Sequence, residues 1–152
     1  MEFNKEQLEV RVLLKDDIAA CVEIYIDAYS KEPWNEKYDY TSVHKYIEKY
    51  LKLNSFLGFV LMKNDEIIGE IFGLVMPTAF SDYYRIEDFC INPKYQNKGV
   101  GSKFIELVKE QLKDRALDSI ILNTNRKFPS FLFYKKNGFV DLEESATLFL
   151  KL

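Results

Sequence analysis

Apolar residues recur at intervals of three and four in three stretches of the chain, which is the spacing of one face of an α-helix. These stripes are Ile18, Cys21, Val22, Tyr25, Ala28 and Tyr29, then Val43, Tyr46, Ile47, Tyr50 and Leu51, and then Val100, Phe104, Leu107, Val108 and Leu112. Two aspartates at 16–17 begin the first helix, Thr41 is the expected N-cap of the second, and the third ends near Asp114. A shorter fourth helix is expected from Pro129 to the Asn-Gly pair at 137–138.

Other stretches are short, apolar and rich in residues that favour strands. They are residues 9–14, 56–62, 67–76, 86–91, 119–124, 139–142 and 147–152. The polar turn Lys-Asn-Asp-Glu at 63–66 predicts a hairpin, and hairpins imply antiparallel neighbours, whereas strand-helix-strand units imply parallel ones. We therefore expect an α/β fold of the mixed α+β kind, in which about four helices flank a mixed sheet of six to seven strands.

Length and charge limit the possible organisation and partners. A chain of 152 residues is of the size of one domain, so we expect a single domain over 1–152. Its 21 basic and 24 acidic residues give a formal net charge of −3, which provides no basic field for a nucleic-acid backbone. We therefore expect no nucleic-acid partner.

The cysteines and the N-terminus exclude further classes. Cys21 and Cys90 stand in apolar runs without metal-ligand spacing, so we expect two buried free thiols and no metal. The first residues lack the apolar core of a signal peptide, and no apolar run approaches the roughly 18 residues of a membrane span. We expect a cytoplasmic protein without a membrane partner.

Residues 84–103 combine an apolar strand that ends in Asn-Pro, a glycine turn and the start of a helix. Gly99 and Gly101 leave the backbone free of side chains where the third helix begins. The unpaired N–H groups at the positive end of a helix dipole form a binding site for phosphate or pyrophosphate. The N–H groups of residues 96–102 are the expected cradle.

Three kinds of phosphate loop share this outline, and their spacings differ. A P-loop needs four residues between its first glycine and a Gly-Lys-Ser/Thr triplet, which this stretch does not contain. A dinucleotide-binding loop needs a third glycine where Phe104 stands, and too little chain follows for the remaining strand-helix units. The third pattern, Gln96-x-x-Gly99-x-Gly101, resembles the acetyl-coenzyme A loop of the GNAT family of N-acetyltransferases.

Two further features resemble the same family. Residues 133–139, Phe-Tyr-Lys-Lys-Asn-Gly-Phe, are similar to its Tyr-x-x-x-Gly-Phe helix end, and the order of expected elements is similar to its fold over essentially the full length. The loop Glu-Pro-Trp-Asn-Glu at 32–36 resembles one from a bacterial branch that acts on aminoglycosides and other small amines. The resemblance also implies a splay between strands 4 and 5, and homodimers, which are common in this family.

For the donor, the resemblance implies that acetyl-coenzyme A binds along the strand end and the glycine loop. The backbone at 89–91 would pair with the pantetheine arm, and an N–H near Ile91 would polarise the thioester carbonyl. Where many relatives carry an asparagine, this chain has Lys127, and Asn123 or Asn125 is the expected substitute. The other implied cofactor-binding residues are Phe89, Cys90, Ile91, Gln96, Asn97, Lys98, Gly99, Val100, Gly101, Ser102 and Lys103.

Acetyl transfer to an amine also needs an acid and a base. The resemblance places the Tyr134 hydroxyl beside the sulfur, where it would protonate the departing thiolate. Glu87 and Asp88 are candidate bases, and alternation along a strand puts them on opposite faces unless a bulge intervenes. Relatives favour Asp88, whereas either carboxylate could instead bind a cationic substrate, and a water chain could serve as the base.

The acceptor is expected to enter over the loop at 30–40, between the first two helices. Its acidic and aromatic side chains, those of Glu32, Trp34 and Glu36, suit a cationic amine. The sequence thus favours an acetyl-coenzyme A-dependent N-acetyltransferase acting on a small-molecule or peptide amine. The alternatives are a non-catalytic acyl-coenzyme A sensor of the same fold and, with less support, a nucleotide-binding module.

Overall fold

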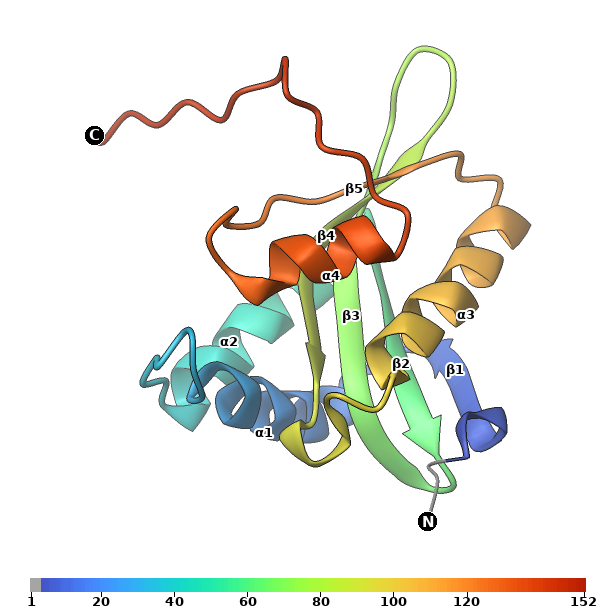
Figure 1. The fold of residues 1–152 in the computed structure, drawn as a ribbon, viewed down its shortest axis with the longest axis vertical. Coiled ribbons are helices and arrows are strands. Elements are labelled where there is room, and N and C mark those ends of the chain that lie inside the picture. Colours follow the sequence, from blue (N-terminus) through green and yellow to red (C-terminus); the bar gives the residue numbers. More distant parts are fainter. Residues whose placement is uncertain (1–3) are drawn as a thin grey trace.

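The computed structural model describes residues 4–152, apart from the side chain of Glu6. Its centre is a five-stranded sheet in the order β1-β2-β3-β4-β5 (Figure 1). The strands are β1 Leu8–Val12, β2 Phe56–Lys63, β3 Glu66–Met76, β4 Tyr83–Ile91 and β5 Ile120–Ile121. The first four pair antiparallel, and β5 pairs parallel to β4. The expected mixed sheet is confirmed.

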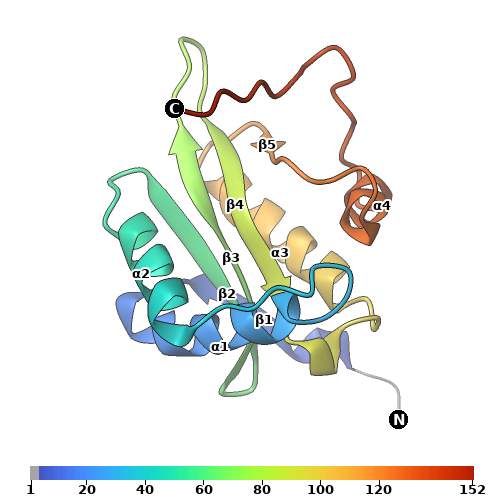
Figure 2. The same cartoon turned by 90° about the vertical axis from the view of Figure 1, so that its left-hand side faces the viewer.

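Four α-helices cover the two faces of this sheet: α1 Ile18–Tyr29, α2 Tyr40–Leu51, α3 Val100–Asp114 and α4 Pro129–Lys136. Figure 2 shows α2 and α3 on opposite faces. Each face has its own apolar core, because strand side chains alternate between the faces. The core under α1 and α2 includes Cys21, Val22, Val43, Ile47, Val60 and Phe72, and the core under α3 includes Phe59, Leu61, Ile71, Tyr84, Phe104 and Val108. None of the helices in residues 4–152 has the length and apolar character that crossing a membrane requires.

The helices and first four strands agree with the sequence pattern, and the C-terminal part differs from it. The strand expected at 119–124 is paired only at Ile120–Ile121, and those expected at 139–142 and 147–152 have no strand pairing. Residues 4–152 therefore contain five strands rather than six or seven. A strand forms only where another strand supplies its hydrogen bonds, and a local apolar pattern cannot supply that neighbour.

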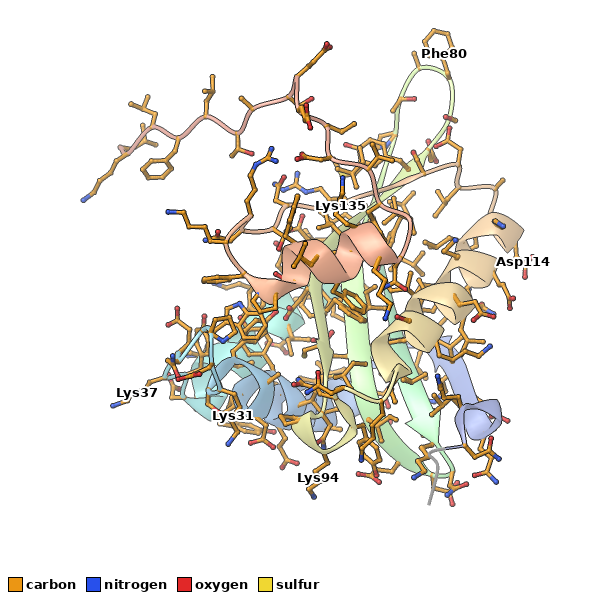
Figure 3. The ribbon with its side chains drawn as sticks, viewed as in Figure 1. Lys31, Lys37, Phe80, Lys94, Asp114 and Lys135 are labelled. Carbon is orange, nitrogen blue, oxygen red and sulfur yellow. The ribbon has the colours of Figure 1, made fainter. Side chains whose placement is uncertain are left out.

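One local prediction is corrected and another is confirmed. The N-cap of α2 is Asp39 rather than Thr41, because the Asp39 carboxylate accepts a hydrogen bond from the Ser42 N–H at 3.0 Å. Both cysteines are free and buried, as expected. The turn at 77–82 links β3 to β4 and carries Phe80 at its tip, away from the body of the protein (Figure 3).

A β-bulge interrupts the pairing of β3 with β4. Phe72 pairs with Asp88, but the next residue, Gly73, pairs with Ile86, so Glu87 is an extra residue on β4. A Cβ atom at Gly73 would lie 1.8 Å from the carbonyl oxygen of Arg85. The close approach of the two backbones at the bulge therefore requires glycine at position 73.

The bulge reverses the alternation of side chains along β4. Before it, Tyr84 and Ile86 point into the core under α3. After it, Phe89 takes that side, whereas Cys90 packs against Ile24 and Ala28 of α1. The bulge thus decides which side chains at the end of β4 face the first two helices.

Gly73→Ala is expected to destabilise the protein, because the new methyl group must displace the backbone of β4. We expect a loss of about 1–3 kcal/mol in the free energy of unfolding, measured by urea denaturation. Gly69→Ala on the same strand is the matched control, since its nearest obstruction is the flexible end of the Ile91 side chain. Equal losses in the two variants would contradict the role given to Gly73.

Candidate functional site

The N-terminus of α3 has the features of an anion-binding site. Gly99 is its N-cap and adopts the left-handed region at φ +73°, which glycine enters without strain. The first intrahelical donor is Lys103, whose N–H bonds the Gly99 carbonyl at 3.2 Å. Helix geometry therefore gives the N–H groups of Val100, Gly101 and Ser102 no carbonyl partner within the helix, and they lie at the positive end of its dipole.

A cavity of about 290 Å³ lies against this helix end. Its lining includes the lysines Lys5, Lys103 and Lys109, together with Asn137 at the end of α4. A Cβ at Gly99 would lie 2.7 Å from the Lys5 ammonium, so glycine leaves room for that charge beside the helix. Lys103 is paired with Glu106 of the same lining at 3.0 Å, and the bare backbone N–H groups with the ammonium groups of Lys5 and Lys109 fit a pyrophosphate such as that of coenzyme A.

The loop before α3 is tied to the end of β4. The Gln96 side-chain amide donates to the Ile91 carbonyl at 2.9 Å, and the Lys98 ammonium donates to the Lys94 carbonyl at 3.0 Å. Asn97 adopts a positive φ of 58°, which turns the chain toward Gly99. Gln96 therefore sets the position of the glycine turn relative to the strand.

One edge of β4 is open where the strand ends. β5 pairs with β4 only at Tyr84 and Arg85, so the described chain places no strand beside 88–91 on that edge. The Asn92 N–H donates to Ile68 of β3 at 2.8 Å, so alternation turns the Ile91 N–H toward the open edge. This arrangement corresponds to the predicted splay between strands 4 and 5.

Aromatic rings of α4 stand over this strand end. The Phe133 ring stacks on Phe89 with centroids 5.7 Å apart, and the Tyr134 centroid lies 6.3 Å from that of Phe89. A Cβ at Gly101 would lie 3.1 Å from the Phe133 ring, so α3, α4 and β4 meet here. Burial, and next the nearby charge of Asp88, raise the pKa of Tyr134 above its usual value, so its hydroxyl keeps its proton.

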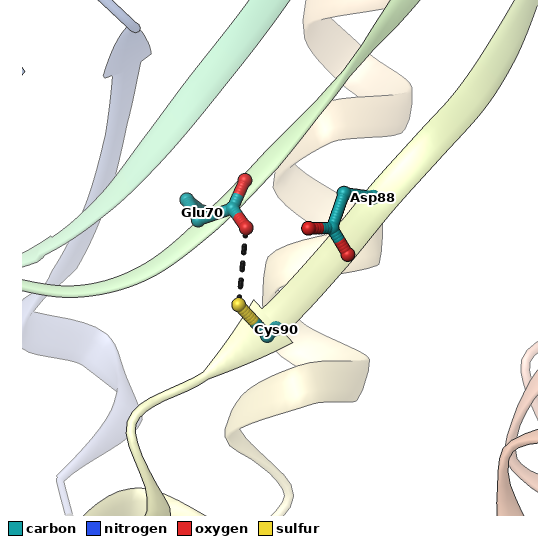
Figure 4. Close-up of side chains that lie close together, drawn as sticks. All are labelled: Glu70, Asp88 and Cys90. Atoms are coloured by element: carbon teal, nitrogen blue, oxygen red, sulfur yellow. Dashed lines mark hydrogen bonds between the residues drawn. The ribbon is translucent and has the colours of Figure 1, made fainter. Parts of the chain in front are cut away.

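On the opposite face of β4, two carboxyl groups and a thiol form a buried cluster (Figure 4). Glu70 of β3 and Asp88 of β4 are 0% and 5% exposed, and ligand atoms of Glu70, Asp88 and Cys90 all lie within 4.8 Å of one another. The Cys90 thiol donates to Glu70 Oε1 at 3.0 Å. Among the described residues, Glu70 Oε2 and Asp88 Oδ2 have no hydrogen-bond partner.

Burial favours the neutral form of both carboxyl groups. It raises the pKa of Asp88 to about 7, against the opposing effects of the Tyr29 hydroxyl and the Phe89 N–H, which both donate to its Oδ1. Burial, and next the charge of Asp88, raise the pKa of Glu70 well above its usual value. Asp88 ionises first, because a hydroxyl and an amide stabilise its charge better than the weak thiol donor stabilises that of Glu70.

The same three side chains have the ligand types of a metal site, but their protonation favours a hydrogen-bonded cluster. Burial raises the pKa of Cys90 well above its usual value, which disfavours the thiolate that a metal ion binds. One proton shared by the Glu70 and Asp88 carboxyl groups would instead give both unpaired oxygens a hydrogen-bond partner.

Glu87 and Asp88 both reach toward α1 and α2, although strand alternation alone predicts opposite faces. Glu87 accepts from the Tyr50 hydroxyl of α2 at 3.1 Å and pairs with Arg85 at 2.7 Å. Asp88 accepts from the Tyr29 hydroxyl of α1. The bulge at Glu87 is the cause, since it shifts the alternation by one residue.

The loop between α1 and α2 is connected to this cluster through Tyr29. The half-buried Trp34 ring contacts Tyr29 at 5.3 Å and Phe128, just before α4, at 6.0 Å between centroids. Glu32 and Glu36 are exposed on the same loop. In Figure 3 Lys37, at the far end of the loop, points outward from the body.

The two asparagines proposed to replace Lys127 have different surroundings. Asn125 holds the turn before α4, because its side-chain oxygen accepts from the Lys127 N–H at 2.9 Å and its carbonyl accepts from the Phe128 N–H at 3.0 Å. Asn123 lines the same large cavity as Tyr134. Asn123 therefore has the more open position for contact with a ligand.

Several site residues were missed in the sequence: Lys5, Tyr29, Glu70, Lys109 and Asn137. Lys5, Lys109 and Asn137 come from separate elements, and nothing in their local sequence marks them. For Glu70 there was a signal, since it is an acidic residue inside the apolar run at 67–76. Burying such a group is costly without a partner, so a carboxylate in a buried strand indicates a polar cluster.

Comparison with known proteins identifies the family and the fold. The model of the acetyltransferase (GNAT) family matches residues 18–139. A possible acetyltransferase from Clostridium difficile 630 superposes with a TM-score of 0.81 at 14% identity, covering 96% of this chain and 99% of that one. A GNAT family acetyltransferase from Staphylococcus aureus gives 0.70 at 20% identity, covering 96% and 98%.

A third similar structure is an aminoglycoside acetyltransferase from an uncultured soil metagenomic sample in complex with sisomicin. It superposes with a TM-score of 0.74 at 16% identity and covers 97% of both chains. At such identities the superpositions establish the fold, and the family match extends through both the glycine loop and Tyr134. From its sequence and its fold, the chain belongs to the acetyltransferase (GNAT) family.

Proposed function

We propose that this protein is an acetyl-coenzyme A-dependent N-acetyltransferase that acetylates a primary amine of a small molecule or peptide. The observation that carries the proposal is the arrangement around the end of β4. The open edge of this strand adjoins the N-terminus of α3 and its lysine-lined cavity, and the face toward α1 carries the buried carboxyl group of Asp88, whose pKa is raised to about 7. Donor and base would thus lie on either side of one strand. When bound, acetyl-coenzyme A supplies an acyl group activated as a thioester.

For the donor, the glycine loop would hold the pyrophosphate. The N–H groups of 100–102 would bind it, and the ammonium groups of Lys5, Lys103 and Lys109, which line the adjoining cavity, would balance its charge. The open edge at 89–91 would pair with the pantetheine arm as an added strand. The Ile91 N–H, turned toward that edge, would polarise the thioester carbonyl.

For the amine, Asp88 would act as the base. An alkylamine with a pKa of about 10.4 is neutral in only about one molecule in 2,500 at pH 7, a handicap of about 4.6 kcal/mol. Asp88 is buried, but Tyr29 donates to it and is itself half-buried beneath Trp34. The Tyr29 oxygen could therefore receive the amine proton while its own proton passes to Asp88. Glu87, which Arg85 already neutralises, is the less suitable base.

Tyr134 would complete the chemistry as the general acid. Its raised pKa keeps the hydroxyl protonated at neutral pH, and its ring is fixed by Phe89, Phe133 and Phe139. On the acceptor side, Glu32, Trp34 and Glu36 would bind a cationic amine. The similarity to aminoglycoside acetyltransferases supports this substrate class as a proposal.

The central test is release of free thiol from acetyl-coenzyme A with a panel of aminoglycosides, polyamines and peptide amines. We expect turnover with at least one cationic amine. Binding of acetyl-coenzyme A without turnover on the whole panel would favour the non-catalytic sensor, and failure to bind it would reject both functions.

Gly101→Glu is expected to abolish cofactor binding, because the carboxylate would occupy the pyrophosphate cradle beside Phe133. Calorimetry with acetyl-coenzyme A should show at least a roughly hundredfold loss of affinity, since both charge repulsion and steric exclusion oppose binding. Gln111→Glu adds the same charge nearer the other end of α3 and should bind normally. Undiminished affinity in a folded Gly101→Glu variant would refute the placement.

Tyr134→Phe is expected to lower kcat about ten- to a thousandfold, the range for loss of an acid–base group or slightly below it. Affinity for acetyl-coenzyme A should stay nearly unchanged, because the ring contacts with Phe89 and Phe139 are kept. Steady-state kinetics and calorimetry on the same preparation separate the two effects. Normal turnover in the Tyr134→Phe variant would show that the Tyr134 side chain contributes packing and not proton transfer.

The pH dependence should report Asp88. A base must be deprotonated to act. Because the pKa of Asp88 is raised to about 7, the decrease of kcat/KM with falling pH should be steeper below pH 7 than above it, by a further factor of about ten per pH unit. Asp88→Asn should lose both activity and this extra steepening, whereas Glu87→Gln should keep the break. A wild-type profile without a break between about pH 6 and 8 would exclude Asp88 as the base.

A further inference from the structure

Glu70 lies beside the candidate base Asp88, and the proposed reaction gives it no role. It stands on β3, the central strand of the sheet, and its side chain is fully buried. An ionised carboxylate without a partner is strongly disfavoured in such a place, so the group keeps its proton or has its charge offset. An apolar side chain would fill the same space without this cost, so packing alone does not explain a glutamate here.

Strand pairing places Glu70 diagonally opposite Asp88. The cross-strand partner of Glu70 is Cys90, and Asp88 lies two residues before Cys90 on the same face of β4. Figure 4 shows the two carboxyl groups turned toward each other from neighbouring strands. Each has one oxygen without a hydrogen-bond partner among the described residues, Glu70 Oε2 and Asp88 Oδ2. Two oxygens that both need a donor thus face each other.

No cation is paired with either carboxyl group in the described part of the chain. The ion pairs formed by residues 4–152 do not include Glu70 or Asp88, and Glu87, which precedes Asp88, is paired with Arg85. The other titratable groups around the pair are phenols and thiols, which burial keeps neutral: Cys21, Tyr25 and Tyr29 of α1, Tyr46 and Tyr50 of α2, Tyr84 and Cys90 of β4, and Tyr134 of α4. Hydrogen-bond donors must therefore stabilise an ionised Asp88.

We propose that Glu70 is a positioning residue for the base: it keeps its proton and donates it to Asp88 Oδ2, which leaves Asp88 Oδ1 to accept from Tyr29. This inference rests on the proposed function, in which Tyr29 passes the amine proton to Asp88. The Glu70 proton is not transferred. It stabilises the Asp88 anion and holds the carboxyl group with Oδ1 toward α1, while the Cys90 thiol holds the other Glu70 oxygen at 3.0 Å. Glu70 thereby sets the pH range in which the base is available.

Carbon-13 NMR of the cofactor-free protein, labelled at the side-chain carboxyl carbons of aspartate and glutamate, locates the proton without any turnover. We expect the Asp88 signal to titrate at about pH 7 and the Glu70 signal to remain that of a neutral carboxyl group through this transition. Asp88→Asn and Glu70→Gln assign the two signals. Ionisation of Glu70 before Asp88 in the wild-type protein would overturn the proposal.

Glu70→Met and Glu70→Gln separate the hydrogen bond from the volume of the side chain, because only the glutamine amide can donate. Glu70→Met should raise the Asp88 midpoint by about one to two pH units, since the anion loses a donor. Glu70→Gln should stay within about half a pH unit of wild type. Val60→Ala, opposite Glu70 on β2, is the control for lost packing and should leave the midpoint unchanged. An unchanged or lowered midpoint in Glu70→Met would overturn the proposal.

The pH profile of kcat/KM connects this hydrogen bond to the reaction. In Glu70→Met the break should move upward with the Asp88 midpoint, so that kcat/KM at pH 7 falls about five- to fiftyfold, and Glu70→Gln should restore the wild-type break. A midpoint that moves without the break would overturn the positioning role. Absence of turnover in the wild-type protein would instead reject the proposed function, whereas the NMR titrations, which need no acceptor, still decide whether Glu70 donates to Asp88.

Discussion

The close approach of two backbones at Gly73 is the constraint on which the site depends. It admits the extra residue Glu87 into β4, and from that point onward the strand presents its side chains to the opposite faces. Asp88 is thereby buried against α1 instead of packing under α3, and Phe89 takes its place beside α4. Without the bulge, the carboxylate would face the aromatic rings on the donor side and the phenyl ring would face the polar cluster.

Burying Glu70 and Asp88 together costs stability. Both pKa values are raised on folding, so the folded protein holds these protons more tightly than the unfolded chain. The contribution of Asp88 is therefore most favourable below its unfolded pKa, near pH 4, and is lost as the pH rises through about 7. A carboxyl group that is buried at a cost to stability and exchanges its proton near neutral pH supports the proposed role of Asp88 as the base.

In the proposed function, the two faces of β4 have different roles. The α3 side carries the helix N-terminus, the lysines and Tyr134, whereas the α1 and α2 side carries the carboxyl groups, Tyr29 and the tryptophan loop. Only the strand end belongs to both sides. The candidate donor residues of the glycine loop are adjacent in sequence, whereas Lys5, Lys109 and Tyr134 come from separate elements.

The sequence by itself determined the helices, the first four strands, the glycine cradle and the family, because each depends on local periodicity or on residues at fixed spacing. It also marked Tyr134 and the pair Glu87 and Asp88. Tertiary structure alone decided that both carboxylates face α1 and α2, that Glu70 lies beside Asp88, and that Lys5 and Lys109 join the cradle. It also left 147–152 without a partner despite its strand pattern. These outcomes depend on strand register and on contacts between distant residues, and neither is encoded in the local order of apolar and polar positions.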